Sequence, residues 1–215
     1  MKKFLIGTAF MALALASPAS AATTIFFSDF ETQSPGTTSG FTIVNTADVW
    51  TKEAGTDGIE LQFGSTGGDP LGPNNRVKVE LDSTSNSGMY YTFQNAGVFT
   101  LSFLFSPRPN VGSLSNLVEL FLDGVKLGSY TGGPNGTTIW SQEVVGRFSA
   151  QTGHKLIFRA GGTSESLGGY LDNIKLEQVA AVPEPSTWMM MLFGFGLVGF
   201  SMRRRRKNSM RYSFA

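Results

Sequence analysis

Short apolar segments with alternating polar positions recur along the chain from residue 23 to residue 180 and predict β-strands. The segment VKVEL at 77–81 alternates strictly, so that one side of the strand faces a core and the other faces outward. Gly, Asn, Asp, Ser and Pro separate the segments, as is typical of turns. We predict strands at 25–30, 41–44, 59–63, 77–81, 89–93, 99–105, 117–122, 125–130, 139–145, 155–159 and 170–176.

The sequence ELFLDGVKLG at 119–128 contains the clearest hairpin signal of the chain. Its Asp123-Gly124 pair suits the two positive φ angles of a type I′ turn. The strand region at 23–180 has no helical period. Most of the 18 phenylalanines of the chain lie in the predicted strands. Strands with one apolar face must cover one another, so the pattern predicts an all-β fold of two packed antiparallel sheets, a β-sandwich.

The N-terminus has a different pattern. Two lysines precede an uncharged, mostly apolar stretch at 4–16, and Ala-Ser-Ala at 19–21 places small residues where signal peptidase cleaves. We predict a secretory signal peptide at 1–21, with the Sec export machinery and signal peptidase as partners. The alternative for this segment is an ordinary N-terminal core helix.

The C-terminal stretch at 188–202 is uncharged and apolar, and four arginines follow it directly: Arg203, Arg204, Arg205 and Arg206. As a helix it is ~23 Å long, against a hydrocarbon core of ~30 Å. Trp188 and the long arginine side chains extend this reach at the two interfaces. We predict a short transmembrane helix at 188–202 and a basic cytoplasmic tail at 203–215. A nucleic-acid-binding patch is the weaker alternative for the arginines, because an apolar helix adjoins them.

A proline-containing motif lies between the strand region and this helix, in a linker at 181–187. Its residues are Val182, Pro183, Glu184, Pro185, Ser186 and Thr187. The prolines keep this backbone extended and accessible to a protease. Followed by an apolar span and an arginine cluster, the motif resembles the PEP-CTERM sorting signal. The tail after Lys207 is longer than usual for this signal.

The resemblance to the PEP-CTERM signal implies a route and a destination. It implies export in a Gram-negative bacterium, a transient tether at the inner membrane, and processing by an exosortase. The final location would be the cell envelope, the outer surface or the extracellular matrix. Systems of this kind accompany exopolysaccharide and biofilm production.

The strand region resembles the galactose-binding-like jelly rolls, in particular the DUF642-like domains. The matching segments are FFSDFE at 26–31, the stretch at 74–109, LVELFLDGVKLG at 117–128 and the stretch at 154–177. The resemblance implies a single β-sandwich domain at 22–180 that binds carbohydrate. It also implies adjacent first and last strands and, in many such domains, a structural Ca²⁺ ion.

Charge and cysteine content exclude several functions for this domain. Residues 22–180 contain nine Lys and Arg against fifteen Asp and Glu, a net charge of −6. An acidic surface repels nucleic acid, so we expect no nucleic-acid partner. The chain has no cysteine, which excludes disulfides, thiol nucleophiles and cysteine-ligated zinc.

Carboxylates near the two ends of the domain are candidate metal ligands. Asp29 and Glu31 follow the first predicted strand, and Asp172 lies in the last one. Calcium prefers several oxygen ligands, so these three residues are a candidate calcium site. The alternative is that the carboxylates are solvated or accept hydrogen bonds from backbone N–H groups.

Aromatic residues are the candidate sugar contacts, because sugar rings stack their C–H faces on aromatic rings. The candidates are Trp50, Tyr90, Tyr130 and Trp140, with Arg108 as a polar partner. The alternative is that these rings fill the sandwich core. Tyr90 and Tyr91 are adjacent, so only one of them faces inward.

We predict no catalytic residues. His154 is the single histidine, and no G-x-S-x-G motif accompanies it, so nothing in the sequence indicates a serine triad. The leading hypothesis is therefore an exported, non-enzymatic protein that binds polysaccharide. The alternatives are a structural surface protein that mediates protein contacts and a carbohydrate-active enzyme.

Overall fold

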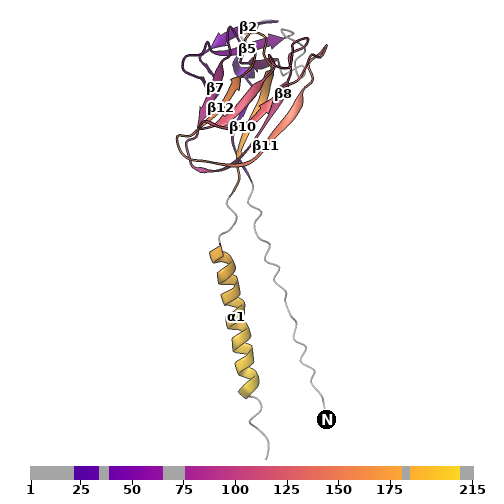
Figure 1. Ribbon diagram of the computed structural model, residues 1–215. Coiled ribbons are helices and arrows are strands. Elements are labelled where there is room, and N and C mark those ends of the chain that lie inside the picture. Colours follow the sequence, from indigo (N-terminus) through magenta and orange to yellow (C-terminus); the bar gives the residue numbers. More distant parts are fainter. Residues whose placement is uncertain (1–21, 34–38, 65–75, 181–184, 209–215) are drawn as a thin grey trace, which may run out of the picture. The chain divides into compact units, whose positions relative to one another are not determined.

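The computed structural model describes residues 22–33, 39–64, 76–180 and 185–208. These residues fall into two compact units, one at Ala22–Ala180 that contains the strands and one at the C-terminus that contains a helix (Figure 1). The predicted signal peptide at 1–21 lies outside the described residues, and so do Val182, Pro183 and Glu184 of the predicted sorting motif.

Each predicted strand segment overlaps a strand of the structure. The strands are β1 (Thr23–Ser28), β2 (Ser39–Val44), β3 (Thr46–Ala47), β4 (Trp50–Lys52), β5 (Ile59–Gly64), β6 (Val77–Glu80), β7 (Gly88–Thr92), β8 (Gly97–Ser106), β9 (Val118–Leu122), β10 (Val125–Tyr130), β11 (Ser141–Ala150), β12 (Lys155–Ala160) and β13 (Tyr170–Gln178). A short 3₁₀ helix, η1 (Glu31–Gln33), follows β1. The prediction missed β3 and β4, which are too short to show a period.

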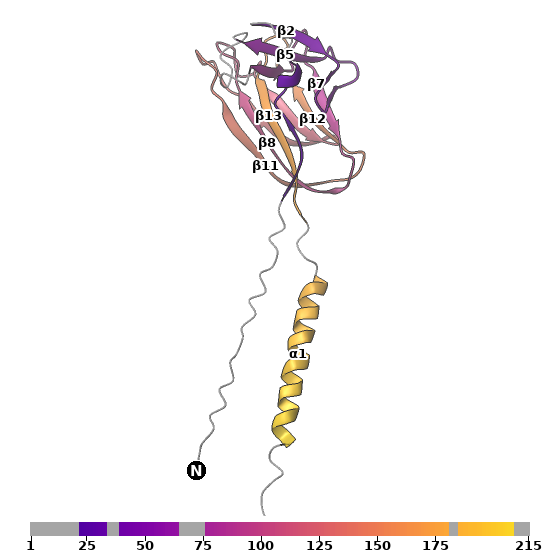
Figure 2. The same ribbon diagram turned by 180° about the vertical axis from the view of Figure 1, so that it is seen from behind.

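The strands form two sheets in which every pair is antiparallel. Sheet A has the order β11-β8-β13-β6-β5-β2, with β1 also paired to β13, and sheet B has the order β10-β9-β12-β7-β4-β3. From β6 to β9 each successive strand lies in the other sheet, as in a jelly roll. Figure 2 shows β13, β8 and β11 of sheet A next to one another. The predicted antiparallel β-sandwich is confirmed.

The first and last strands are neighbours, as the resemblance to galactose-binding-like domains implies. Phe26 of β1 lies opposite Leu176 of β13. The register of β13 shifts between Asp172 and Lys175, where Asn173 has a φ of 48°. The start of β13 therefore pairs with β6, and its later part pairs with β1.

The β9–β10 hairpin has the predicted turn. Asp123 has a φ of 48° and Gly124 a φ of 85°, and Leu122 pairs with Val125 across them. Both central residues are left-handed, as a type I′ turn requires. The type I′ turn predicted at Asp123-Gly124 is confirmed.

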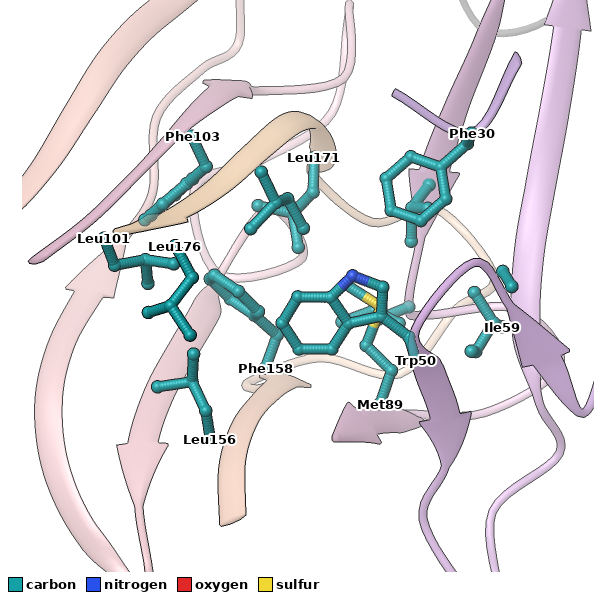
Figure 3. Close-up of a cluster of buried hydrophobic side chains, with 14 of the residues drawn as sticks. Phe30, Trp50, Ile59, Met89, Leu101, Phe103, Leu156, Phe158, Leu171 and Leu176 are labelled. Carbon is teal, nitrogen blue, oxygen red and sulfur yellow. The ribbon is translucent and has the colours of Figure 1, made fainter. Parts of the chain in front are cut away.

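The core lies between the two sheets, and Trp50 of β4 is at its centre (Figure 3). The Trp50 ring lies 5.6 Å from that of Phe158 on sheet B and 5.5 Å from that of Phe26 on sheet A. Its Nε1 donates a hydrogen bond to Ser28 Oγ at 3.1 Å. The prediction that Trp50 contacts sugar is wrong, because the side chain is 0% exposed and its polar atom is already satisfied.

The helix of the C-terminal unit is α1 (Pro185–Asn208). Every side chain described in it, from 188 to 204, is exposed. In the described part of the chain, no helix is both long enough and apolar enough to cross a bilayer. The helix predicted at 188–202 lies within α1, and fifteen of its residues form the uncharged stretch.

Replacing Trp50 tests the importance of the core. We expect Trp50→Ala to lower the free energy of unfolding of the full chain by ~3–5 kcal/mol, the usual loss for a buried aromatic residue. The matched control is Trp188→Ala in α1, a residue that is 57% exposed. Chemical denaturation followed by circular dichroism measures both, and equal effects of the two substitutions would contradict the assignment.

Candidate functional site

A pocket opens at one lateral edge of the sandwich, between the edge strands β10 of sheet B and β11 of sheet A. Both edge strands are labelled in Figure 1. We call this cavity the edge pocket. Its volume is about 400 Å³, and it is lined by Phe105, Pro107, Ser129, Tyr130, Thr131, Asn135, Ile139, Ser141 and Glu143.

Tyr130 supplies the aromatic wall of the edge pocket. Its ring packs edge-on against Phe103 of the core, with the two centroids 4.8 Å apart. A Cβ atom at Gly128 would lie 2.7 Å from the Tyr130 hydroxyl, so a glycine is needed there for the ring to lie where it does. Burial, and then the charge of Glu143, raise the pKa of Tyr130.

Ser141 and Glu143 supply polar groups from the opposite strand. In β11 they lie across from Phe105 and Phe103, on the side of sheet A that faces the core. Ser141 Oγ donates a hydrogen bond to Glu143 Oε1 at 2.7 Å. The edge pocket therefore combines one phenol ring with hydroxyl, amide and carboxylate groups.

Asn116 ties together two loops that adjoin Pro107 and Thr131 of the edge pocket. Its Oδ1 accepts a hydrogen bond from Arg108 N at 2.8 Å, and its Nδ2 donates to Val111 O at 3.1 Å and to Gly132 O at 2.9 Å. The side chain is fully buried. The sequence analysis missed this residue, because its partners are distant in the chain and no motif marks it.

A second polar cluster, which we call the carboxylate layer, lies on the outer face of sheet A. Glu60 of β5 lies directly opposite Glu80 of β6, and Gln62 Nε2 donates to both carboxylates, at 2.8 Å to Glu60 Oε1. Arg108 Nη1 lies 2.7 Å from Glu80 Oε2, and Gly168 N donates to Glu80 Oε1. Burial is the main cause that raises the pKa of Glu80 from 4.5 to about 8, and it raises the pKa of Glu60 as well.

Two predicted site residues meet beside this layer. The Trp140 ring lies 6.4 Å from that of Tyr170, with the planes at 32°, and Arg108 Cζ lies 5.9 Å from the Tyr170 ring centroid. Trp140 Nε1 is buried and has no hydrogen-bond partner. The structure thus brings Trp140 and Arg108 together, but around a buried tyrosine that the sequence analysis did not single out.

The remaining predicted aromatic residues are dispersed. Tyr130 faces the edge pocket, whereas Tyr90 lies on the outer face of sheet B, with Lys155 Nζ 4.0 Å from its ring centroid. Tyr91 faces the core and packs 4.8 Å from Phe26, so one of the two adjacent tyrosines points inward, as predicted. Of the four aromatic candidates, only Tyr130 lines the edge pocket.

The carboxylates predicted to bind calcium accept hydrogen bonds from backbone N–H groups. Glu31 Oε1 already accepts hydrogen bonds from Val77 N at 2.8 Å and from Arg76 N, and Asp29 Oδ1 accepts one from Glu31 N at 3.3 Å. Asp172 is buried in β13 and accepts one from Asn173 N at 2.6 Å. Within the described ranges, no three acidic or histidine side chains come together to hold a metal. Each of the three carboxylates thus accepts a backbone N–H group, as the alternative expected, and calcium binding stays a prediction.

The predicted sorting segment lies partly inside the described residues. Helix α1 begins at Pro185, earlier than the predicted 188, which agrees with the preference of proline for the first turn. Of the arginine cluster, Arg203 and Arg204 are exposed, and Arg204 lies over the Phe200 ring at 5.4 Å. The side chains of Arg205 and Arg206 lie outside the described part.

The tail belongs to a known class of sorting signals. Residues 181–206 match the description "PEP-CTERM protein-sorting motif". The chain therefore carries a PEP-CTERM sorting motif downstream of a two-sheet β-sandwich, as the sequence resemblance indicated. A comparison with curated proteins gave no match.

Solved structures with similar folds include three proteins of different kinds. The Stig cyclase Fisc from Fischerella sp. TAU is 14% identical, with 75% of this chain and 100% of that chain covered and a TM-score of 0.49. The CBM22-1 xylan-binding domain of Xyn10C from Paenibacillus barcinonensis is 14% identical (76% and 99% covered, TM-score 0.47). The K3 cleaved adhesin domain of Lys-gingipain from Porphyromonas gingivalis w83 is 15% identical (71% and 98% covered, TM-score 0.47). At these values the likenesses assign no function to this chain.

The carboxylate layer predicts a stability that depends on pH. The folded pKa of Glu80 is about 8 and its ordinary value is 4.5, so between these values the folded chain holds a proton that the unfolded chain has released. The free energy of unfolding should therefore fall as pH rises through this window, by at most about 1.4 kcal/mol per pH unit. Glu80→Gln should flatten the dependence. Glu177→Gln, which alters a surface ion pair with Lys175, is the control. An unchanged slope in Glu80→Gln would contradict the assignment.

The hydrogen bonds of Asn116 predict a stability effect in the loops beside the edge pocket. Asn116→Ala removes the partners of one backbone N–H and two carbonyl groups, and each buried unsatisfied group costs ~1–3 kcal/mol. We expect a loss of at least ~2 kcal/mol in the free energy of unfolding, measured by denaturant titration. Asn95→Ala, at an exposed position before β8, should leave it unchanged. A loss no larger than that of the control would show that these bonds do not hold the loops.

Proposed function

We propose that this protein is exported, sorted to the cell surface by its C-terminal motif, and binds carbohydrate in the edge pocket without chemically altering it. The observation that carries the proposal is the composition of the pocket. A half-buried tyrosine ring faces hydroxyl, amide and carboxylate groups across a cavity of about 400 Å³. This volume is typical of small-molecule sites, which range over ~300–1,000 Å³.

The chemistry of the edge pocket suits a sugar ring. The apolar C–H face of a sugar stacks on a phenol ring such as that of Tyr130. Its hydroxyl groups donate to a carboxylate such as Glu143 and exchange hydrogen bonds with hydroxyl and amide side chains. Because Asn116 ties the loops that adjoin Pro107 and Thr131, this part of the lining is held in place before the ligand arrives, which reduces the entropic cost of binding.

The sorting motif supports the proposed route and destination. The Sec machinery exports the chain, signal peptidase removes the predicted signal at 1–21, and an exosortase receives the tail at the inner membrane. The mature domain then lies in the envelope, on the outer surface or in the extracellular matrix. There its ligand would be the exopolysaccharide of a biofilm.

The placement of the acidic and histidine residues supports a non-catalytic role. A glycosidase needs two carboxylates on either side of an accessible glycosidic bond. Glu80 is 0% exposed and is held by Gln62, Arg108 and Gly168, so it does not reach a substrate. His154 directly precedes β12, with its Nε2 3.8 Å from Asp123 Oδ2 of the neighbouring hairpin.

A structural role in protein contacts is the second candidate. It is favoured by apolar side chains on the outer side of sheet A, where Phe27 is 54% exposed and Phe41 62% exposed. Exposed aromatic residues of this kind occur at protein interfaces. This role and sugar binding use different surfaces of the sandwich.

A glycan array tests the proposed function. The full chain, applied to an array that includes the organism's own exopolysaccharide, should bind a defined set of glycans. Tyr130→Ala should weaken that binding by about tenfold, because it removes the stacking surface.

The control is Tyr90→Ala, which removes a tyrosine from the outer face of sheet B. It should leave glycan binding unchanged. Retention of binding in a folded Tyr130→Ala protein would place the sugar elsewhere. The absence of any glycan ligand would favour the structural role.

A further inference from the structure

Glu143 is the one charged residue among those that line the edge pocket. Its Oε1 accepts a hydrogen bond from Ser141 Oγ. In the described part of the chain, the acidic residues that form ion pairs with lysine or arginine are Glu53, Glu80, Glu119 and Glu177. Glu143 is absent from this set, so its charge is not neutralised by a lysine or arginine.

An unneutralised carboxylate in a concave site favours a cation. The surrounding domain adds to this preference, because residues 22–180 carry a net charge of −6. The raised pKa of Tyr130, to which Glu143 contributes, agrees with the carboxylate acting on that side of the cavity. The neutral Tyr130 ring presents a face that also attracts cations.

We infer that the edge pocket selects an amino sugar with a free ammonium group, which pairs with Glu143 while the sugar ring stacks on Tyr130. This inference rests on the proposed function and names its ligand class. An amino sugar combines the cation that the carboxylate needs with the ring hydroxyls that suit Ser129, Thr131 and Asn135. A uronic acid would instead place its own carboxylate against Glu143.

A lysine side chain of a partner protein carries the same ammonium group. It has no hydroxyl groups, so it would leave the pocket's hydroxyl and amide side chains without ligand partners. The amino sugar uses both kinds of group, and for this reason the pocket is assigned to it. The lysine alternative is tested below as a competitor.

The experiment compares two ligands that differ only in N-acetylation. The acetyl group converts the amine, which can carry a positive charge, into a neutral amide. Glucosamine oligomers and N-acetylglucosamine oligomers of the same length are titrated into the full chain by calorimetry at low salt and at a mildly acidic pH, at which the free amines are protonated. We expect the free-amine oligomer to bind at least about tenfold more tightly, because a charge-assisted bond replaces a neutral one. This comparison uses the unaltered protein and does not depend on the folding of any variant.

Two matched variants separate Glu143 from the overall charge of the domain. Glu143→Gln keeps the shape of the side chain and should remove the preference for the free amine. Asp123→Asn removes one negative charge at the β9–β10 turn, where asparagine also adopts positive φ, and should keep the preference. Circular dichroism of both variants checks that they are folded.

Each outcome decides the assignment. Loss of the preference in Glu143→Gln alone supports it. Equal binding of both oligomers, or equal loss in both variants, overturns it and leaves the proposed sugar-binding function standing. Displacement of the oligomer by Nα-acetyl-lysine amide at the same concentration as by glucosamine would assign the pocket to a protein partner. If no oligomer and no arrayed glycan binds, the proposed function fails together with this inference.

Discussion

The structure depends on the burial of the inner faces of two β-sheets against each other. The chain has no cysteine, so no disulfide contributes to holding the sheets together. The contact is made by interlocking rings: Phe103 of sheet A packs 5.0 Å from Phe158 of sheet B, and Trp50 packs against Phe158 (Figure 3). Because burial of apolar surface is the dominant favourable term in folding, this layer fixes the spacing of the sheets and hence everything built on their edges.

The edge pocket is a consequence of that packing. Two stacked sheets leave an open side wherever their edge strands do not meet, and here β10 and β11 flank such an opening. Tyr130 belongs half to the core, through Phe103, and half to the pocket. Asn116 holds two loops together, because its side chain forms hydrogen bonds with backbone groups of both. A rigid core thus positions polar groups on two edge strands and on the loops beside them, and loops on a rigid scaffold commonly carry binding residues.

The alternation of apolar and polar residues was sufficient to locate the main strands, because a repeat of two residues can be recognised within one short segment of the chain. The Asp123-Gly124 turn was equally local. What the sequence could not reveal was set by pairing between distant segments. Trp50 belongs to a three-residue strand, which is too short to show an alternation of apolar and polar residues. Its inward orientation follows from the pairing of β4 with β7, which the sequence does not show. The opposition of Glu60 and Glu80 likewise depends on the register of β5 against β6, and the partners of Asn116 on loops that no motif marks.

Two glutamates with the same side chain have different roles because their surroundings differ. Glu80 is buried and receives hydrogen bonds from Gln62, Arg108 and Gly168, so its oxygens are used within the protein and it stabilises the outer face of sheet A. Glu143 has a hydroxyl donor on one oxygen, no cation in the described structure, and an open cavity beside it. The oxygens of Glu80 are left with no hydrogen-bonding capacity for a ligand, whereas those of Glu143 keep most of theirs. The site is therefore recognised by unsatisfied bonding capacity next to accessible space, and not by the presence of acidic residues alone.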